Sequence, residues 1–261
     1  MGAAGTLGVA ALYRRAVGAP AVPAWADWKD LLNMLPQAAT LTAARAAAGL
    51  PTVSFAVQKI EEAKSTKTNF DRYTVSISKL PAGKTAQQLF NEMRKGLNNF
   101  FDHTKSTIAG YKTEDANKWA SQGKATFGTI MLFKIPAFGP IGEQAAVITS
   151  VAEDVRWVFT PVEIGIACPG EHPVSGNREF GWKAVGSSYE LYTRAVDRAT
   201  GICPGVVGED FIFNGADALW RSWQAKLVEH VNQAGGTAVA VAPVVHRPTW
   251  ADVKASGLFT R

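Results

Sequence analysis

A thiol and an imidazole lie four residues apart at Cys168 and His172. Together they can form a thiolate–imidazolium pair, which is the arrangement that activates a cysteine nucleophile. The proline and glycine that follow the cysteine disfavour a helix here, so a loop must bring the two side chains together. The candidates for a third group that orients the imidazole are Glu171, Glu179 and Asp197. The alternative is a turn with a buried cysteine and a surface histidine.

Charged residues continue along the next stretch, which reads as a hairpin of two strands, residues 178–185 and 189–196, joined across Gly-Ser-Ser. Alternation places Arg178 on one face and Glu179 on the other, and we predict that Glu179 pairs with Arg194 across the strands. One interpretation is a solvated, salt-bridged face. The other is a site for an anion or polar head group, because guanidinium groups bind carboxylate and phosphate in a forked geometry. Its donors would be Arg178, Arg194 and Arg198.

The elements that must position these residues follow from the periodicity of the sequence. We predict a long amphipathic helix capped by Asn214 or Asp217 and running to about residue 234. A shorter helix runs from the cap Thr85 to about residue 102, and residues 103–124 read as a loop. The predicted strands are residues 73–77, 126–135, 145–151, 155–162 and 237–242, besides the two of the hairpin.

Residues 1–50 are rich in alanine and are predicted to form a helical arm, with helices at 9–17, 25–35 and 38–48. An apolar stripe on the second of these predicts that the arm packs on the main domain, residues 51–261, or on another chain. The stripe comprises Trp25, Trp28, Leu31, Leu32 and Leu35.

Consecutive strands with short turns predict an α+β protein with an antiparallel sheet, covered by the long helix that carries Trp220 and Trp223. This order of elements, over about residues 70–235, resembles the helix-grip (START-like) fold. In that family a curved sheet grips a long C-terminal helix, with a cavity between them for lipids, polyketides or other apolar ligands. The arm and the Cys168 loop depart from the family pattern.

The resemblance implies a binding protein for an apolar or amphipathic small molecule held between sheet and helix. The ligand-binding residues expected on this basis are Trp157, Phe159, Arg178, Tyr192, Arg194, Arg198, Trp220 and Trp223. The aromatic members suit a plain hydrophobic core equally well. Two rival hypotheses are an enzyme or secreted effector toxin that uses Cys168, His172 and Glu179, and an assembly subunit whose arm binds a protein partner.

Composition narrows the partners. The 261 residues carry a formal charge of +5 and no basic run with interleaved aromatics, so no nucleic-acid partner is predicted. No apolar run is long enough for a membrane span, and the N-terminal apolar run precedes its arginines, the reverse of a secretory signal. The expectation is a cytoplasmic protein, or one exported without a cleavable signal. No metal-ligand spacing is present, so neither metal nor cofactor is predicted. Cys168 and Cys203 each begin a Cys-Pro-Gly triplet, which leaves a disulfide and two reduced thiols both open.

Overall fold

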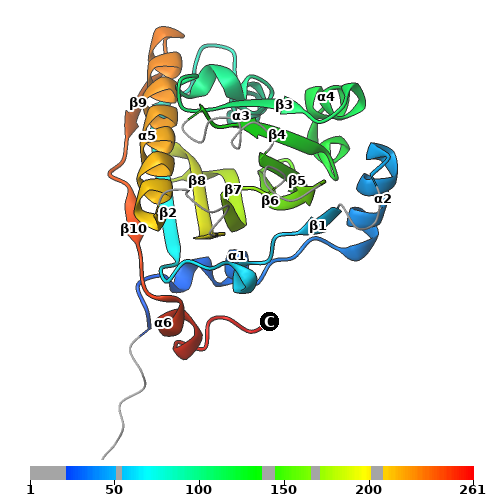
Figure 1. The fold of residues 1–261 in the computed structure, drawn as a ribbon. Helices are drawn as coiled ribbons and strands as arrows, with labels where there is room; N and C mark the ends of the chain where they lie inside the picture. Colours follow the sequence, from blue (N-terminus) through cyan, green and yellow to red (C-terminus); the bar gives the residue numbers. More distant parts are fainter. Residues whose placement is uncertain (1–21, 51–54, 137–144, 166–170, 201–207) are drawn as a thin grey trace, which may run out of the picture.

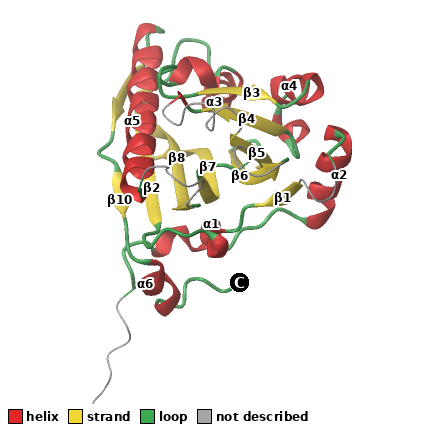
Figure 2. Cartoon of the chain, in the orientation of Figure 1, coloured by secondary structure: helices red, strands yellow, loops and turns green. Residues whose placement is uncertain are grey.

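The computed structural model describes residues 22–50, 55–136, 145–165, 171–200 and 208–261. Within these ranges ten strands form one antiparallel sheet, in the order β10-β2-β8-β7-β6-β5-β4-β3, with β1 added to β6 and β9 to β2 (Figure 2). Both cysteines and the predicted helix at residues 9–17 lie outside the described residues. The strands are β1 Phe55–Val57, β2 Asn69–Lys79, β3 Thr107–Gly110, β4 Ile130–Lys134, β5 Ala145–Ala152, β6 Arg156–Ile164, β7 Val174–Val185, β8 Ser188–Ala199, β9 Thr237–Ala240 and β10 Val244–His246.

The α-helices are α1 Lys29–Leu32, α2 Ala38–Ala48, α3 Ala86–Lys95, α4 Thr113–Ala120, α5 Glu209–Gln233 and α6 Trp250–Ala255. Helix α5 runs alongside the sheet (Figure 1) and buries Trp223, Leu227 and Val231 against it together with α3. We call the side of the sheet that carries Phe180 the helix face. There Trp157 and Phe180 stack with ring centroids 4.5 Å apart. The predicted α+β class, with a long helix over an antiparallel sheet, is confirmed.

The opposite side of the sheet, which carries Glu179 and which we call the outer face, is covered by segments from both ends of the described chain. Trp28 and Leu31 from the beginning and Val253 of α6 share one buried cluster with Phe70 and Val196 of the sheet. The Trp28 indole nitrogen donates to the backbone oxygen of Asp71, 3.0 Å away. Trp28, Leu31 and Leu32 of the predicted apolar stripe are therefore buried against the sheet of the same chain, whereas Trp25 is half-buried and Leu35 is exposed.

Several local predictions are confirmed because short-range chemistry decides them. Thr85 caps α3 with a full capping box, and Gly49 ends α2 with a left-handed φ of 65°. The predicted hairpin is present, but it turns over Gly186 and Ser187 alone rather than over the predicted Gly-Ser-Ser, because Val185 pairs with Ser188 and Gly186 adopts a φ of 58°. In the register that results, Glu179 lies opposite Arg194, as predicted.

Other predictions are wrong where long-range contacts decide the structure. Helix α5 begins at Glu209 rather than at Asn214 or Asp217, because the Glu209 carboxylate binds the backbone N–H groups of Thr66 and Lys67 at 2.8 and 3.2 Å. The predicted helix at residues 25–35 is reduced to a short 3₁₀ turn and α1.

The predicted loop at residues 103–124 contains β3 and α4. The Asn98 side chain bonds both backbone groups of Ile108, and the Asp115 carboxylate accepts from the Ile130 backbone N–H at 2.9 Å. The helix predicted from Thr85 to residue 102 ends at Lys95 and continues only as a 3₁₀ turn, and the strand predicted from residue 126 begins at Ile130.

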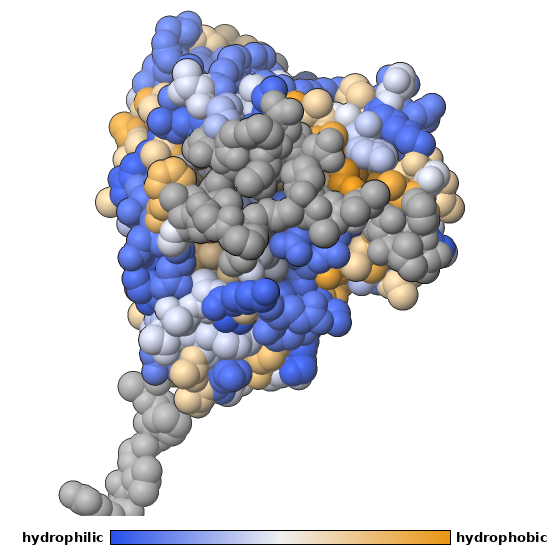
Figure 3. Space-filling model, viewed as in Figure 1, coloured by the Kyte–Doolittle hydropathy of each residue, from blue (hydrophilic) through white to orange (hydrophobic). Residues whose placement is uncertain are grey.

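The molecular surface in the orientation of Figure 3 is mainly hydrophilic, with hydrophobic residues in small groups between the polar ones. Among the helices of the described ranges, none combines the length and apolar character that crossing a membrane requires.

Candidate functional site

A cavity of about 320 Å³ lies between the helix face of the sheet and the N-terminal half of α5. Its walls are mostly apolar but include the polar residues Ser106, His172, Arg178 and Asp197. The apolar residues that enclose it include Phe133, Val147, Phe159, Ile212, Leu219 and Trp220.

Small residues of α5 contribute to the space of the cavity. Trp223, Leu227 and Val231 in the C-terminal half are fully buried and pack over the sheet. Along the cavity the helix carries the small residues Gly215, Ala216 and Ala218 between the larger Ile212 and Trp220. Space therefore remains between these small residues and the sheet.

Arg178 projects from β7 toward α5 and is held on three sides. Its Nη2 lies 2.8 Å from Oδ2 of Asp71 on β2, and its Nη1 donates to the Thr193 hydroxyl at 3.2 Å. The guanidinium stacks on the Trp220 ring with its central carbon 4.2 Å from the centroid. Arg178 thus carries a charge that Asp71 largely compensates, in an orientation fixed by packing.

Asp197 on β8 is buried beside this pair. Its Oδ2 is 3.4 Å from the Asn69 amide nitrogen and 3.9 Å from Nη2 of Arg178, so neither contact is close. Burial raises the pKa of Asp197 to about 7, and the charge of Asp71 adds to this effect, while Arg178 opposes it. Near neutral pH the cavity therefore contains a carboxyl group that is protonated in a large fraction of molecules.

His172 contributes an uncharged imidazole to the wall. Its backbone is anchored by the Gln58 side chain, whose Oε1 accepts from the His172 N–H at 2.6 Å. The ring Nδ1 lies 3.1 Å from the Val174 backbone oxygen and 3.2 Å from the Val174 nitrogen. Burial is the main reason why the pKa of His172 falls to about 4, and the nearby Arg178 charge lowers it further.

Ser106 completes the polar set. Its side chain is fully buried, and its Oγ has no hydrogen-bond partner among the described residues. A buried hydroxyl without a partner is costly. Because this oxygen has almost no exposed surface, it is not a binding group for a molecule in the cavity.

The structure brings some of the predicted site residues together and separates others. Phe159, Arg178 and Trp220 line the cavity with His172 and Asp197. Trp157 and Trp223 lie beside it, fully buried in the core of the helix face. The residues on the outer face, across the sheet from the cavity, are Glu179, Tyr192, Arg194 and Arg198.

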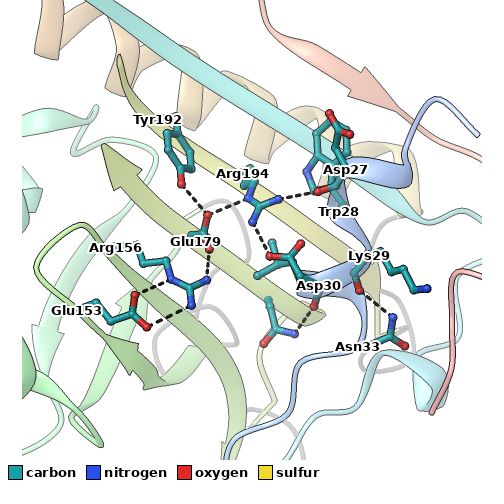
Figure 4. A network of polar contacts seen from close by, with 12 residues as sticks. Asp27, Trp28, Lys29, Asp30, Asn33, Glu153, Arg156, Glu179, Tyr192 and Arg194 are labelled. Atoms are coloured by element: carbon teal, nitrogen blue, oxygen red, sulfur yellow. Dashed lines mark hydrogen bonds and ion pairs between the residues drawn. The ribbon is translucent and has the colours of Figure 1, made fainter. Parts of the chain in front are cut away.

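Glu179 is the centre of a buried network on that outer face (Figure 4). Its side chain is 1% exposed, and its two oxygens accept from Tyr192 at 2.9 Å, Arg194 at 2.9 Å and Arg156 at 3.1 Å. Arg194 continues to Oδ2 of Asp30 at 2.7 Å. Burial is the main cause of the raised pKa of Tyr192. The network therefore ties the N-terminal segment to the sheet.

Arg198 has a similar bridging position. It donates to the backbone oxygens of Ile60, at 2.9 Å, and of Ser65. Its guanidinium carbon also lies 4.6 Å from the centroid of the Trp250 ring, at the start of α6. Of the three residues of the catalytic hypothesis, His172 lines the cavity, Glu179 lies across the sheet from it, and Cys168 is outside the described residues.

Two polar residues of this region, Asp71 and Ser106, were not anticipated from the sequence. The position of Asp71 could have been predicted, because two-residue alternation places it on the same face of β2 as Tyr73, Val75 and Ile77. Ser106 carries no local signal. Among the described residues, no group of three His, Cys, Asp or Glu side chains is arranged to hold a metal ion.

A curved antiparallel sheet closed by a long helix is a helix-grip arrangement. No family model and no curated protein matches the sequence. Among solved structures, Ara h 8.0201 is similar at 8% identity over 62% of this chain and 99% of its own, with a TM-score of 0.37. The di-domain ARO/CYC BexL from the BE-7585A biosynthetic pathway is similar at 14% identity over 63% of this chain and 46% of its own, with a TM-score of 0.38.

Protein CV1439 from Chromobacterium violaceum is 13% identical over 62% of this chain and 97% of its own, with a TM-score of 0.35. Likenesses of this size do not indicate a function for this chain.

Proposed function

We propose that the protein binds a small amphipathic molecule in the cavity between the sheet and the N-terminal half of α5. The observation that carries this proposal is the cavity itself, whose volume of about 320 Å³ falls in the size range of small-molecule sites. A void of this size in an otherwise close-packed interior loses contact energy that a ligand can restore.

The chemistry of the walls supports an amphipathic ligand rather than a purely apolar one. Phe133, Phe159 and Trp220 provide apolar surface for most of a ligand, while Arg178 and Asp197 provide hydrogen-bonding groups. A few fixed polar groups in an apolar pocket are the usual means by which a site orients its ligand.

A matched pair of substitutions on α5 tests the proposal. Ala216 lines the cavity, whereas Ala225 lies on the same helix with an exposed side chain. We expect Ala216→Phe to place a benzyl group in the cavity and to weaken binding of the uncharged fluorescent probe N-phenyl-1-naphthylamine and of added decanol by at least about tenfold. Ala225→Phe should bind both as the parent does.

Circular dichroism and thermal unfolding show whether each variant has kept its fold. Equal binding by the two variants, or no binding by the folded parent, would contradict the proposal. The alternative of nucleophilic catalysis by Cys168 and His172 stays a prediction, and no described contact favours it.

A further inference from the structure

The cations of the cavity wall already have anionic partners. Arg178 pairs with Asp71 at 2.8 Å, and Lys105 lies 3.5 Å from Oδ2 of Asp102. A carboxylate head group would have to compete with Asp71 for the same guanidinium, and it would enter beside the second carboxyl, Asp197. Like charges at such separations repel strongly in a desolvated site.

The Asp197 carboxyl of the wall lacks a close partner. Its nearest described donors lie at 3.4 and 3.9 Å. The carboxyl can donate a hydrogen bond when it is protonated, and it accepts one in either form. A ligand hydroxyl or carbonyl group satisfies it without bringing a charge into the cavity.

We infer that the cavity selects uncharged ligands that carry a hydroxyl or carbonyl oxygen, in preference to fatty carboxylates and to amines. This inference rests on the proposed binding function and adds the chemical class of the head group. An ammonium group would enter close to the positive charge of Arg178. The Asp197 carboxyl, whose charged form is disfavoured, would not offset the cost of desolvating that ammonium group.

The pKa shifts of the two titratable groups of the wall, His172 and Asp197, agree with this conclusion. Burial shifts the pKa of His172 down and that of Asp197 up, so each is driven toward its uncharged form. A site that disfavours a positive imidazolium and a negative carboxylate alike also disfavours ligand charges of both signs.

Competition among four ligands of equal chain length tests the inference. Decanol, decanone, decanoate and decylamine would each displace the fluorescent probe from the full chain at about pH 6, where the last two compounds are charged. We expect decanol and decanone to bind at least about tenfold more tightly than decanoate and decylamine. The Ala216→Phe variant shows whether displacement occurs at the cavity.

The double substitution Asp71→Asn, Asp197→Asn tests the role of charge compensation. It removes both carboxylates near Arg178, at 2.8 and 3.9 Å, with little change in shape, so we expect the preference to move toward decanoate by at least about tenfold. If this variant does not fold, the ranking measured on the parent decides alone.

The outcomes separate the inference from the proposal beneath it. Decanoate or decylamine binding most tightly to the parent, or all four binding equally, would overturn the inference while leaving the binding function intact. A folded double variant with an unchanged ranking would also overturn it. Absence of any cavity-dependent binding would overturn both.

Discussion

We predict how much the buried carboxylate of Glu179 contributes to the free energy of unfolding by holding the N-terminal segment on the sheet. Its carboxylate is buried and accepts from Tyr192, Arg156 and Arg194, so Glu179→Ala removes the common partner of two guanidinium groups. Breaking a buried ion pair from one side costs about 3–5 kcal/mol, because the charge left behind is poorly solvated. Arg194 keeps Asp30 at 2.7 Å, which favours the lower part of that range.

The matched control is in the same hairpin. Glu190 faces Lys183 across the strands at 3.0 Å, but the two side chains are 28% and 56% exposed. Glu190→Ala should therefore cost no more than about 1 kcal/mol. Urea unfolding followed by tryptophan fluorescence measures both values, provided that the dependence on urea is unchanged between variants.

For a chain of this length, the Glu179→Ala loss corresponds to a fall in melting temperature of roughly 10 °C. Equal losses for the two glutamate variants would refute the reasoning, because the burial and connectivity of Glu179 would then carry no stability. A large loss for Glu179→Ala that Arg194→Met does not share in part would show that Arg194 is not the main partner.

Two further predictions concern the cavity wall and the strand beneath it. Asp197 titrates near 4 when unfolded and at about 7 when folded, so the folded state holds the extra proton and its stability falls as pH rises from about 4 to 7. His172 has the opposite effect, because its lowered pKa of about 4 makes the stability rise between about pH 4 and 6.5. The variant Asp197→Asn lacks the opposing contribution of Asp197, so its stability in urea unfolding should rise across this pH range. A pH profile identical to that of the parent would contradict this prediction. Gly176 has a φ of 139°, and a Cβ there would meet the Val196 backbone oxygen at 2.1 Å, so Gly176→Ala should lose at least about 3 kcal/mol. Gly215→Ala, in the helix with no atom within 4 Å of the new Cβ, should gain about 0.5–1 kcal/mol in the same assay, and a similar effect at both glycines would count against the argument.

Much of the fold could be predicted because its determinants are local. The cap at Thr85, the end of α2 at Gly49 and the alternation of the hairpin each depend on residues within a few positions of one another. The start of α5 and the elements between residues 103 and 124 could not, because Glu209 and Asp115 bind backbone groups of other segments. Such contacts exist only once the tertiary structure is formed.

The candidate site was predictable in part for the same reason. Alternation places Arg178 on the helix face, where the cavity lies, and Arg194 on the other side of the sheet, but it does not say which face α5 covers. The sequence therefore pointed to Arg178, Arg194 and Arg198 as one set of donors, whereas the sheet divides them. Ser106 was beyond reach, because nothing near it in the sequence marks its burial.

The unequal filling beneath α5 has a consequence for how such a protein can diversify. The bulky half of the helix, with Trp223 and Leu227, secures folding, so changes there are penalised. Ala216 and Ala218 line the cavity and contribute little packing themselves, so substitutions at these two positions can reshape ligand preference at small cost in stability. The ligand specificity can therefore change through substitutions at one part of α5, while the rest of the same helix keeps the fold unchanged.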